Sequence, residues 1–247
     1  MEHKAIDINC DVGEGVAHED LLFPHISSCS IACGGHTGNA DSIKAAARLA
    51  KKHKVKIGAH PSYPDAINFG RKVIDITDQE LQNSVSAQLD EFTRVIVKEG
   101  LLMNHIKPHG ALYNQIAKNR RLAVVFLEAI EAYRAEAMLY APFGSQVAEE
   151  ANRRGFRIKY EAFGDRNYND DLSLVSRTQS NALIESPKVV AEHLYRMIAD
   201  KHVKTISGKK VALRANTFCI HGDTSSALEI LTYLTHEFPQ RGIYLDK

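Results

Sequence analysis

The chain has 247 residues, of which 44% are hydrophobic and 25% charged, and its formal net charge is +1. This composition is typical of a globular protein with a sizeable core, and the absence of a long Lys/Arg run argues against nucleic-acid binding. No apolar run is long enough to cross a membrane, and the N-terminus lacks a secretory-signal pattern, so we expect a cytoplasmic protein.

Short apolar runs alternate with longer helical patterns along the chain. The runs predict strands at 5–10, 28–33, 55–59, 101–107, 137–141, 158–162 and 211–220. The longer patterns predict helices at 39–53, 77–99, 120–133, 145–154, 187–202 and 224–238. Strands that alternate with helices indicate a mainly parallel sheet with right-handed crossovers. Because no linker or break in composition interrupts this pattern, we predict a single domain over residues 1–247.

Polar residues alternate with apolar ones in two of the predicted strands. Asp7, Asn9 and Asp11 share one face of the first strand, and His105 and Lys107 share one face of the fourth. Strands of an open sheet covered on both sides are usually apolar throughout, whereas the mouth of a barrel accommodates polar side chains. The α/β pattern therefore favours a TIM-like (β/α) barrel over an open, doubly wound sheet.

Five strand-like runs end in the same kind of segment, in which acidic, histidine or lysine side chains are followed by glycine or proline. These segments are 9–15, 33–39, 58–61, 107–110 and 221–224. Barrel enzymes take their catalytic residues from the C-terminal ends of several strands, so we expect one shared active-site mouth. Neither a P-loop nor a GxGxxG motif is present. The candidate catalytic residues are Asp11, Glu14, His36, His60, Lys107, His109 and His221.

A second group of candidates is cationic. Arg71 and Arg166 follow predicted strands, and an arginine fork suits a carboxylate or phosphate, so both are predicted to bind an anionic ligand. Arg177 lies in a short extended run and could do the same, while Asp165 could brace Arg166. Lys107 is expected either to stabilise an oxyanion or phosphoryl oxygen, or to form a buried ion pair with Asp7 or Asp11.

The four cysteines do not have the spacing of a zinc site, and the chain is too long to need disulfides. All of them lie in strand-like apolar runs, so we expect small buried hydrophobic residues. They are Cys10, Cys29, Cys33 and Cys219.

Taken in order, the strand-end segments resemble the LamB/YcsF family of 5-oxoprolinase A subunits. The matching segments are DINCDVGE (7–14), IACGGHTGN (31–39), GAHPSYPD (58–65), HIKPHGALYN (105–114), FGDRNY (163–168) and CIHGDT (219–224). The resemblance covers essentially the whole chain. Asn39 and Asn216 stand where acidic residues are expected in the family, and Gly35 and Thr37 also depart from its pattern.

The resemblance implies a seven-stranded barrel of the glycoside hydrolase/deacetylase type. It also implies ATP-dependent hydrolysis of 5-oxo-L-proline (pyroglutamate) to L-glutamate, with cleavage of ATP to ADP and phosphate, performed with two partner subunits. ATP would then be a co-substrate, accompanied by Mg²⁺. The substrate-binding residues would be Asn9, Arg71, Asp165, Arg166 and Asp223.

Two questions stay open at this point. By analogy with deacetylase barrels, Asp11, His60 and His109 could hold a divalent metal; alternatively, they could act without metal as a general base and its orienting partners. The protein could also be a stand-alone metal-dependent carbohydrate or amide deacetylase, or a binding subunit without catalytic activity.

Overall fold

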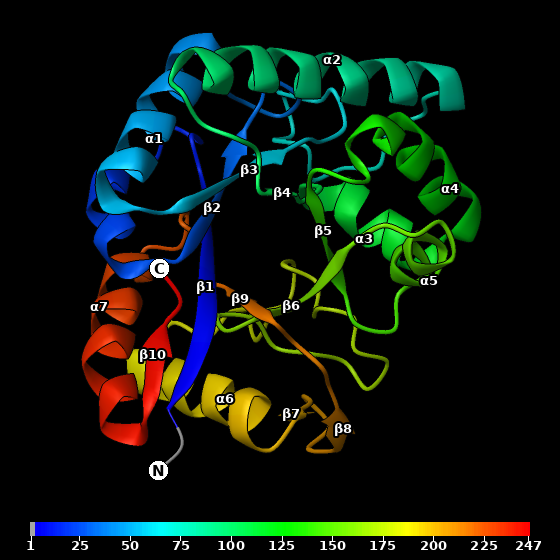
Figure 1. Cartoon of the computed structure of the whole chain (residues 1–247). Helices are drawn as coiled ribbons and strands as arrows, with labels where there is room; N and C mark the ends of the chain where they lie inside the picture. Colours follow the sequence, from blue (N-terminus) through cyan, green and yellow to red (C-terminus); the bar gives the residue numbers. More distant parts are fainter. Residues whose placement is uncertain (1–2) are drawn as a thin grey trace.

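β1 (Lys4–Val12) is the strand that closes the barrel in the computed structural model, which describes residues 3–247 (Figure 1). It pairs in parallel with β2 (Ser28–Ala32) on one side and with β9 (Thr217–Cys219) on the other. Between these lie β3 (Lys56–His60), β4 (His105–Ile106), β5 (Met138–Pro142) and β6 (Ile158–Phe163), each parallel to its neighbours. The predicted fold class, a single-domain seven-stranded α/β barrel, is confirmed for the described residues.

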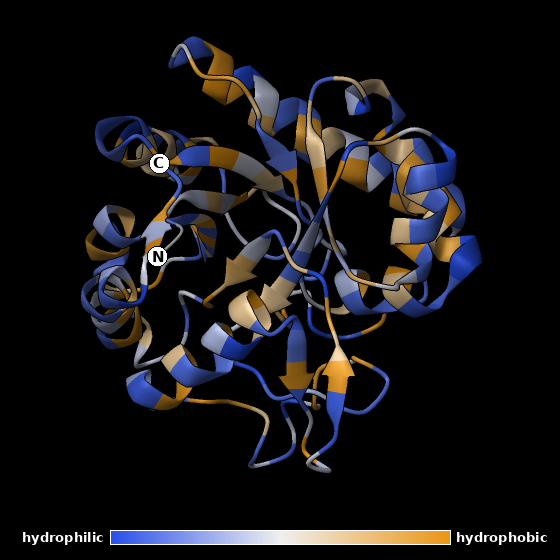
Figure 2. Ribbon diagram, turned by 60° about the horizontal axis from the view of Figure 1, so that its bottom comes forward, coloured by the Kyte–Doolittle hydropathy of each residue, from blue (hydrophilic) through white to orange (hydrophobic). Residues whose placement is uncertain are grey.

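Helices surround this barrel, and their apolar faces build the core between helix and strand. They are α1 (Ala40–His53), α2 (Asp78–Lys98), α3 (Gly110–Lys118), α4 (Arg120–Ala129), α5 (Gln146–Arg153), α6 (Pro187–Ala199) and α7 (Ala227–Glu237). Figure 2 shows hydrophilic and hydrophobic residues alternating along them, as helices with one buried face require. Thr77 and Glu80 form a capping box at the start of α2, as their spacing suggests.

Several predicted elements have different bounds. The expected strand 101–107 is only the two-residue β4, because Gly100 turns the chain at the end of α2 with φ +70° and Leu102 is 85% exposed. The expected strand 211–220 is two strands: β8 (Lys210–Ala212) pairs antiparallel with β7 (His202–Lys204), and β9 enters the barrel. Helix 187–202 ends at Ala199, and helix 120–133 ends at Ala129, before the short η2 (Glu131–Tyr133).

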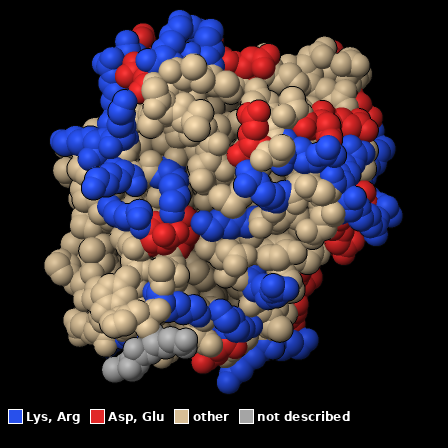
Figure 3. All heavy atoms as spheres, in the orientation of Figure 1, with Lys and Arg blue, Asp and Glu red and all other residues tan. Residues whose placement is uncertain are grey.

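Four elements were not predicted from the sequence. They are η1 (Glu19–His25), α3, β7 and β10 (Ile243–Leu245). β10 pairs with the beginning of β1, outside the closed ring, and η3 (Phe238–Arg241) leads into it. None of the described helices is long and apolar enough to cross a membrane. Basic and acidic side chains are interspersed on the face shown in Figure 3, in keeping with the small net charge.

The interior of the barrel is polar. Oδ1 of Asp7 accepts hydrogen bonds from Ser28 Oγ at 2.8 Å and Thr217 Oγ1 at 2.6 Å, and Oδ2 pairs with Lys159 at 2.9 Å. A buried carboxylate is stable only when it is paired and hydrogen-bonded in this way. The alternation seen in the first strand therefore points its polar residues inward, and the layers above Asp7 lead to the mouth of the barrel.

Candidate active site

A cavity of about 550 Å³ lies at the carboxyl ends of the barrel strands. Six of the seven candidate catalytic residues line it, and His36 lies directly behind Glu14, with its Nε2 at 3.1 Å from Glu14 Oε1. The structure thus brings together groups from segments as distant in sequence as Asp11 and His221. Those lining the cavity are Asp11, Glu14, His60, Lys107, His109 and His221.

Lys107 forms the base of this cavity. Its buried Nζ lies 2.8 Å from Asp11 Oδ1, 2.9 Å from Glu161 Oε1 and 3.2 Å from Asn9 Oδ1. Burial by itself lowers the pKa of Lys107, but the negative charges of Asp11 and Glu161 outweigh it and hold the pKa well above its usual value. Lys107 is therefore a permanent ammonium, and of the two ion pairs considered from the sequence it forms the one with Asp11.

Glu161 is a member of this site that the sequence analysis missed. It is buried on β6, and its Oε1 also accepts a hydrogen bond from Asn9 Nδ2 at 3.0 Å. The available signal was a single acidic residue inside an otherwise apolar predicted strand. Asn9 itself is fully buried beneath Lys107 and does not line the cavity, so it contacts Lys107 and Glu161 rather than open space.

Three histidines and Glu14 form one wall. The rings of His36 and His109 stack with their centroids 3.7 Å apart, and His60 Nε2 lies 3.0 Å from His109 Nδ1. Burial lowers the pKa of His36 to about 3 and that of His109 well below its usual value, so both rings are neutral. Burial, followed by repulsion from Asp11, raises the pKa of Glu14 to about 7.

His221 and Asp165 form a histidine–carboxylate pair on the opposite wall. Asp165 is fully buried, and its carboxylate accepts from Nδ1 of His221 at 2.9 Å and from the backbone N–H of His221 at 3.0 Å. Burial raises the pKa of Asp165, but the charge and hydrogen bonds of His221 outweigh it and lower the pKa overall. Asp165 thus holds His221 and makes no ion pair with Arg166 among the described residues. Nε2 of His221 is left to face a ligand.

The predicted arginines lie around the rim. Arg71 pairs with Asp223, which also lies 3.7 Å from Arg177. Arg166 is buried and donates to the backbone carbonyls of Ala182 at 3.3 Å and Val175 at 2.6 Å. The three guanidinium groups and Asp223 all line the cavity, so an anionic ligand would meet positive charge on this side.

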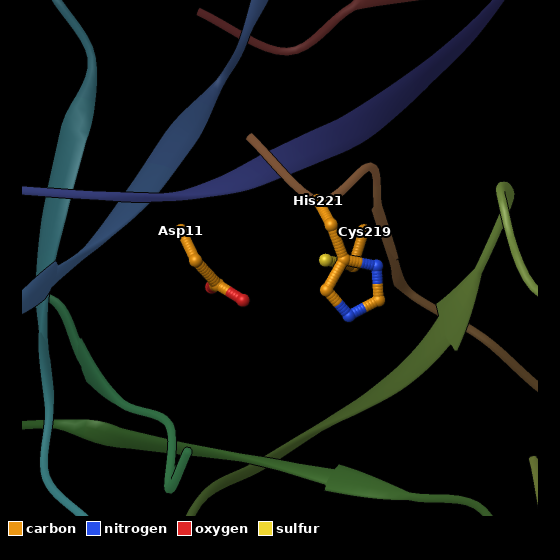
Figure 4. A group of neighbouring side chains, drawn as sticks. All are labelled: Asp11, Cys219 and His221. Atoms are coloured by element: carbon orange, nitrogen blue, oxygen red, sulfur yellow. The ribbon is translucent and has the colours of Figure 1, made fainter. Parts of the chain in front are cut away.

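Two groups of side chains have the spacing of metal ligands. One consists of Asp11, Cys219 and His221, which lie close together at the ends of β1 and β9 (Figure 4). This group already contains a cation, because Lys107 Nζ lies 3.2 Å from Cys219 Sγ and 2.8 Å from Asp11. Burial keeps Cys219 a thiol by raising its pKa, so this group does not fit a metal ion.

The other group consists of Glu14, His36 and His109, with His60 in contact. The trio predicted from the sequence, Asp11, His60 and His109, is therefore divided. Asp11 is bound by Lys107 through Oδ1, and its Oδ2 lies 3.4 Å from His60 Nε2. Glu14, by contrast, lies within 4.0 Å of both His60 and His109. All four cysteines are free and buried, as expected.

Comparison with known proteins agrees with the resemblance seen in the motifs. The model of the LamB/YcsF family matches residues 6–247. Two relatives named as the A subunit of 5-oxoprolinase, from Thermococcus sibiricus and Haemophilus influenzae, are 37% and 36% identical to this chain; the alignments cover 96% and 97% of this chain and 95% and 98% of the relatives. The crystal structure of a lactam utilization protein from Thermus thermophilus superposes with a TM-score of 0.90 at 34% identity, over 98% of each chain. The chain therefore belongs to the LamB/YcsF family.

Proposed function

We propose that this protein is one component of an ATP-dependent 5-oxoprolinase, which hydrolyses 5-oxo-L-proline to L-glutamate while ATP is cleaved to ADP and phosphate. The names of relatives that align over nearly their whole length support this substrate. A lactam is a poor electrophile with a poor leaving group, which gives a chemical reason for coupling ring opening to ATP. Phosphorylation of the amide oxygen would produce an intermediate that water can attack.

The observation that carries the proposal is the position of Lys107 opposite the His221–Asp165 pair in one cavity. A fixed ammonium at the base of the cavity would stabilise the negative oxygen that develops when water adds to the activated carbonyl. His221, oriented by Asp165, would take a proton from that water and return it to the ring nitrogen when the C–N bond breaks. Because ring opening needs both a charge stabiliser and a proton carrier, the site has the parts the reaction requires.

The carboxylate of 5-oxoproline would bind on the arginine side of the cavity. Arg71 is the most accessible of these groups, with a side chain 36% exposed, and Asp223 holds its guanidinium over the mouth. Arg166 lies deeper and would contribute a second cation. In this proposal Asn9 and Asp165, which were predicted to bind substrate, are instead positioning residues for Lys107 and His221.

We further propose that partner subunits perform the phosphoryl transfer. The sequence has no P-loop or other recognised nucleotide motif, and relatives are named as one subunit, designated A, of the enzyme. ATP and its Mg²⁺ would then act largely outside this chain, which would bind the ring and complete its hydrolysis.

The test is an assay of glutamate formation from 5-oxo-L-proline and ATP. We expect turnover with the cognate partner subunits and none when this chain, the partners or ATP is omitted. Hydrolysis of ATP by this chain alone in response to 5-oxoproline would contradict the division of labour. Hydrolysis of an amide by this chain without ATP or partners would support the deacetylase-like alternative instead.

A further inference from the structure

Two hydrogen-bond acceptors face each other in the histidine wall of the cavity. Nδ1 of His60 lies 2.7 Å from the carbonyl oxygen of Lys107, and Nε2 of His109 lies 3.0 Å from the carbonyl oxygen of Phe69. A carbonyl oxygen only accepts, so each of these ring nitrogens carries the proton. The remaining nitrogens, His60 Nε2 and His109 Nδ1, therefore present lone pairs to each other at 3.0 Å.

A third acceptor completes the group. Oε1 of Glu14 lies 3.6 Å from His109 Nδ1 and 4.0 Å from His60 Nε2. The three separations define a triangle whose circumscribed circle has a radius of about 2.1 Å. One point is thus about 2.1 Å from all three atoms, which is the distance at which imidazole nitrogens and carboxylate oxygens bind zinc.

The surroundings hold these three atoms in place. His36 Nε2 lies 3.1 Å from Glu14 Oε1, and Ser62 Oγ lies 3.0 Å from His36 Nδ1. The stacked rings of His36 and His109 fit because residue 70 is glycine at φ +63°; a Cβ there would lie 2.9 Å from His36 Cβ and 3.0 Å from His109 Cδ2. Backbone carbonyls on both histidines and a histidine on the carboxylate are the outer contacts that orient metal ligands in proteins.

The charges nearby also favour a cation. Lys107 is shared by two buried carboxylates, Asp11 and Glu161, and Glu14 adds a third. One ammonium cannot neutralise three carboxylates in a buried site, where an unmatched charge is costly. A divalent ion between Glu14 and the two histidines would supply the two charges that are lacking.

We propose that Glu14, His60 and His109 bind a divalent transition metal of the zinc type, with His36 as the positioning residue for Glu14. This set replaces Asp11, considered from the sequence, by Glu14, because Lys107 binds Asp11 and Glu14 lies near both histidines. The site adjoins the substrate cavity, where such an ion, when bound, lowers the pKa of a coordinated water. Metal binding here does not depend on which reaction the complex catalyses.

The test is metal binding by the full chain, purified without a histidine tag and treated with a chelator. Titration calorimetry with ZnCl₂ should give one tight site, and CoCl₂ should give the visible absorption of a cobalt–imidazole centre. MgCl₂ should not compete, since magnesium prefers oxygen ligands. Elemental analysis of the untreated protein gives an independent measure of occupancy.

Variants separate this site from the neighbouring group at Asp11 and Cys219. Glu14→Gln and His109→Ala should each weaken zinc binding at least 100-fold, and His36→Phe, which removes an outer contact, should weaken it about 10- to 100-fold. His221→Asn should leave zinc affinity and stoichiometry unchanged. Circular dichroism and thermal unfolding check that each variant is folded, and His60→Gln offers a smaller change at the third ligand.

Several results would overturn the proposal. One is the absence of saturable zinc or cobalt binding by the folded, chelator-treated protein. Another is a stoichiometry that survives both Glu14→Gln and His109→Ala but is lost in His221→Asn. A third is ¹⁵N NMR evidence that a proton occupies the His60–His109 contact and does not yield to zinc. Each of these readouts is independent of glutamate formation, so the metal site and the proposed reaction can fail separately.

Discussion

Nζ of Lys107 lies 2.9 Å from Oε1 of Glu161, so the ends of β4 and β6 are joined across the barrel by a buried ion pair. Removing one charge of such a pair leaves the other uncompensated, at a cost of about 3 kcal/mol. We therefore expect Glu161→Gln to lower the free energy of unfolding, measured by urea denaturation, by about this amount. Glu149→Gln, at an exposed position of α5, should change it by less than about 0.5 kcal/mol. Equal stability of the two variants would contradict this role for Glu161.

Asp165 should act on catalysis through His221. Asp165→Asn keeps the size of the side chain but removes the charge that orients and stabilises the imidazole. In the reconstituted complex we expect kcat to fall about 100-fold or more, with little change in KM. The conservative variant Asp165→Glu should restore part of the rate. If kcat of Asp165→Asn equals that of the wild type, His221 does not depend on this carboxylate.

His193 should make the fold sensitive to acid. Burial lowers its pKa to about 4 from an ordinary value of 6.5, although its hydrogen bond to the carbonyl of Arg166 opposes the shift. Between these values the unfolded chain binds a proton that the folded chain does not. Stability is therefore full above pH 6.5 and falls as the pH drops towards 4, by up to about 3 kcal/mol.

The variant His193→Gln keeps an amide donor for the Arg166 carbonyl but does not titrate. Urea denaturation at pH 7 and pH 4 should show a smaller acid loss in the variant than in the wild type, by about 3 kcal/mol. His202→Gln, in β7, serves as the control and should follow the wild type. Parallel losses in wild type and His193→Gln would show that this histidine is protonated equally in the folded and unfolded chains.

Arg71 should act on substrate affinity. Its guanidinium pairs with Asp223 at the rim and is proposed to bind the substrate carboxylate. Arg71→Ala should raise KM for 5-oxoproline about 10- to 100-fold with a smaller effect on kcat, because the carboxylate does not react. Arg94→Ala removes a comparable ion pair with Glu91 on the surface of α2 and should leave KM unchanged. A normal KM in Arg71→Ala would move the carboxylate site elsewhere, with Arg166 as the next group to test.

The sequence predicts the barrel and most of its mouth because the signal is local. An Asp, His or Lys directly after a strand-like run stays at the strand end, and closure of the barrel then brings Asp11, His60 and His221 together. The expected strand 101–107 is wrong because Leu102 is exposed, which an apolar run alone does not reveal. Helix α3 is not evident from the sequence because its first residues belong to the segment 105–114, whose motif also fits a strand end.

The contacts between distant segments could not be predicted. Asp165 and His221 are 56 residues apart, and only the pairing of β6 with β9 shows that the carboxylate holds the histidine. Glu161 carries no motif of its own; it becomes part of the site because β6 places it beside Lys107. Likewise, whether Asp11 or Glu14 faces both His60 and His109 depends on how Lys107 binds Asp11.

The central claim is that the ammonium of Lys107 acts on the substrate, and one comparison tests it most directly. Lys107→Met and Lys159→Met each remove a lysine that pairs with a carboxylate inside the barrel, but only Lys107 lines the cavity. Measured as glutamate formed by the reconstituted complex in the presence of ATP, turnover should be lost in Lys107→Met and retained in Lys159→Met. Normal turnover by folded Lys107→Met would contradict the account.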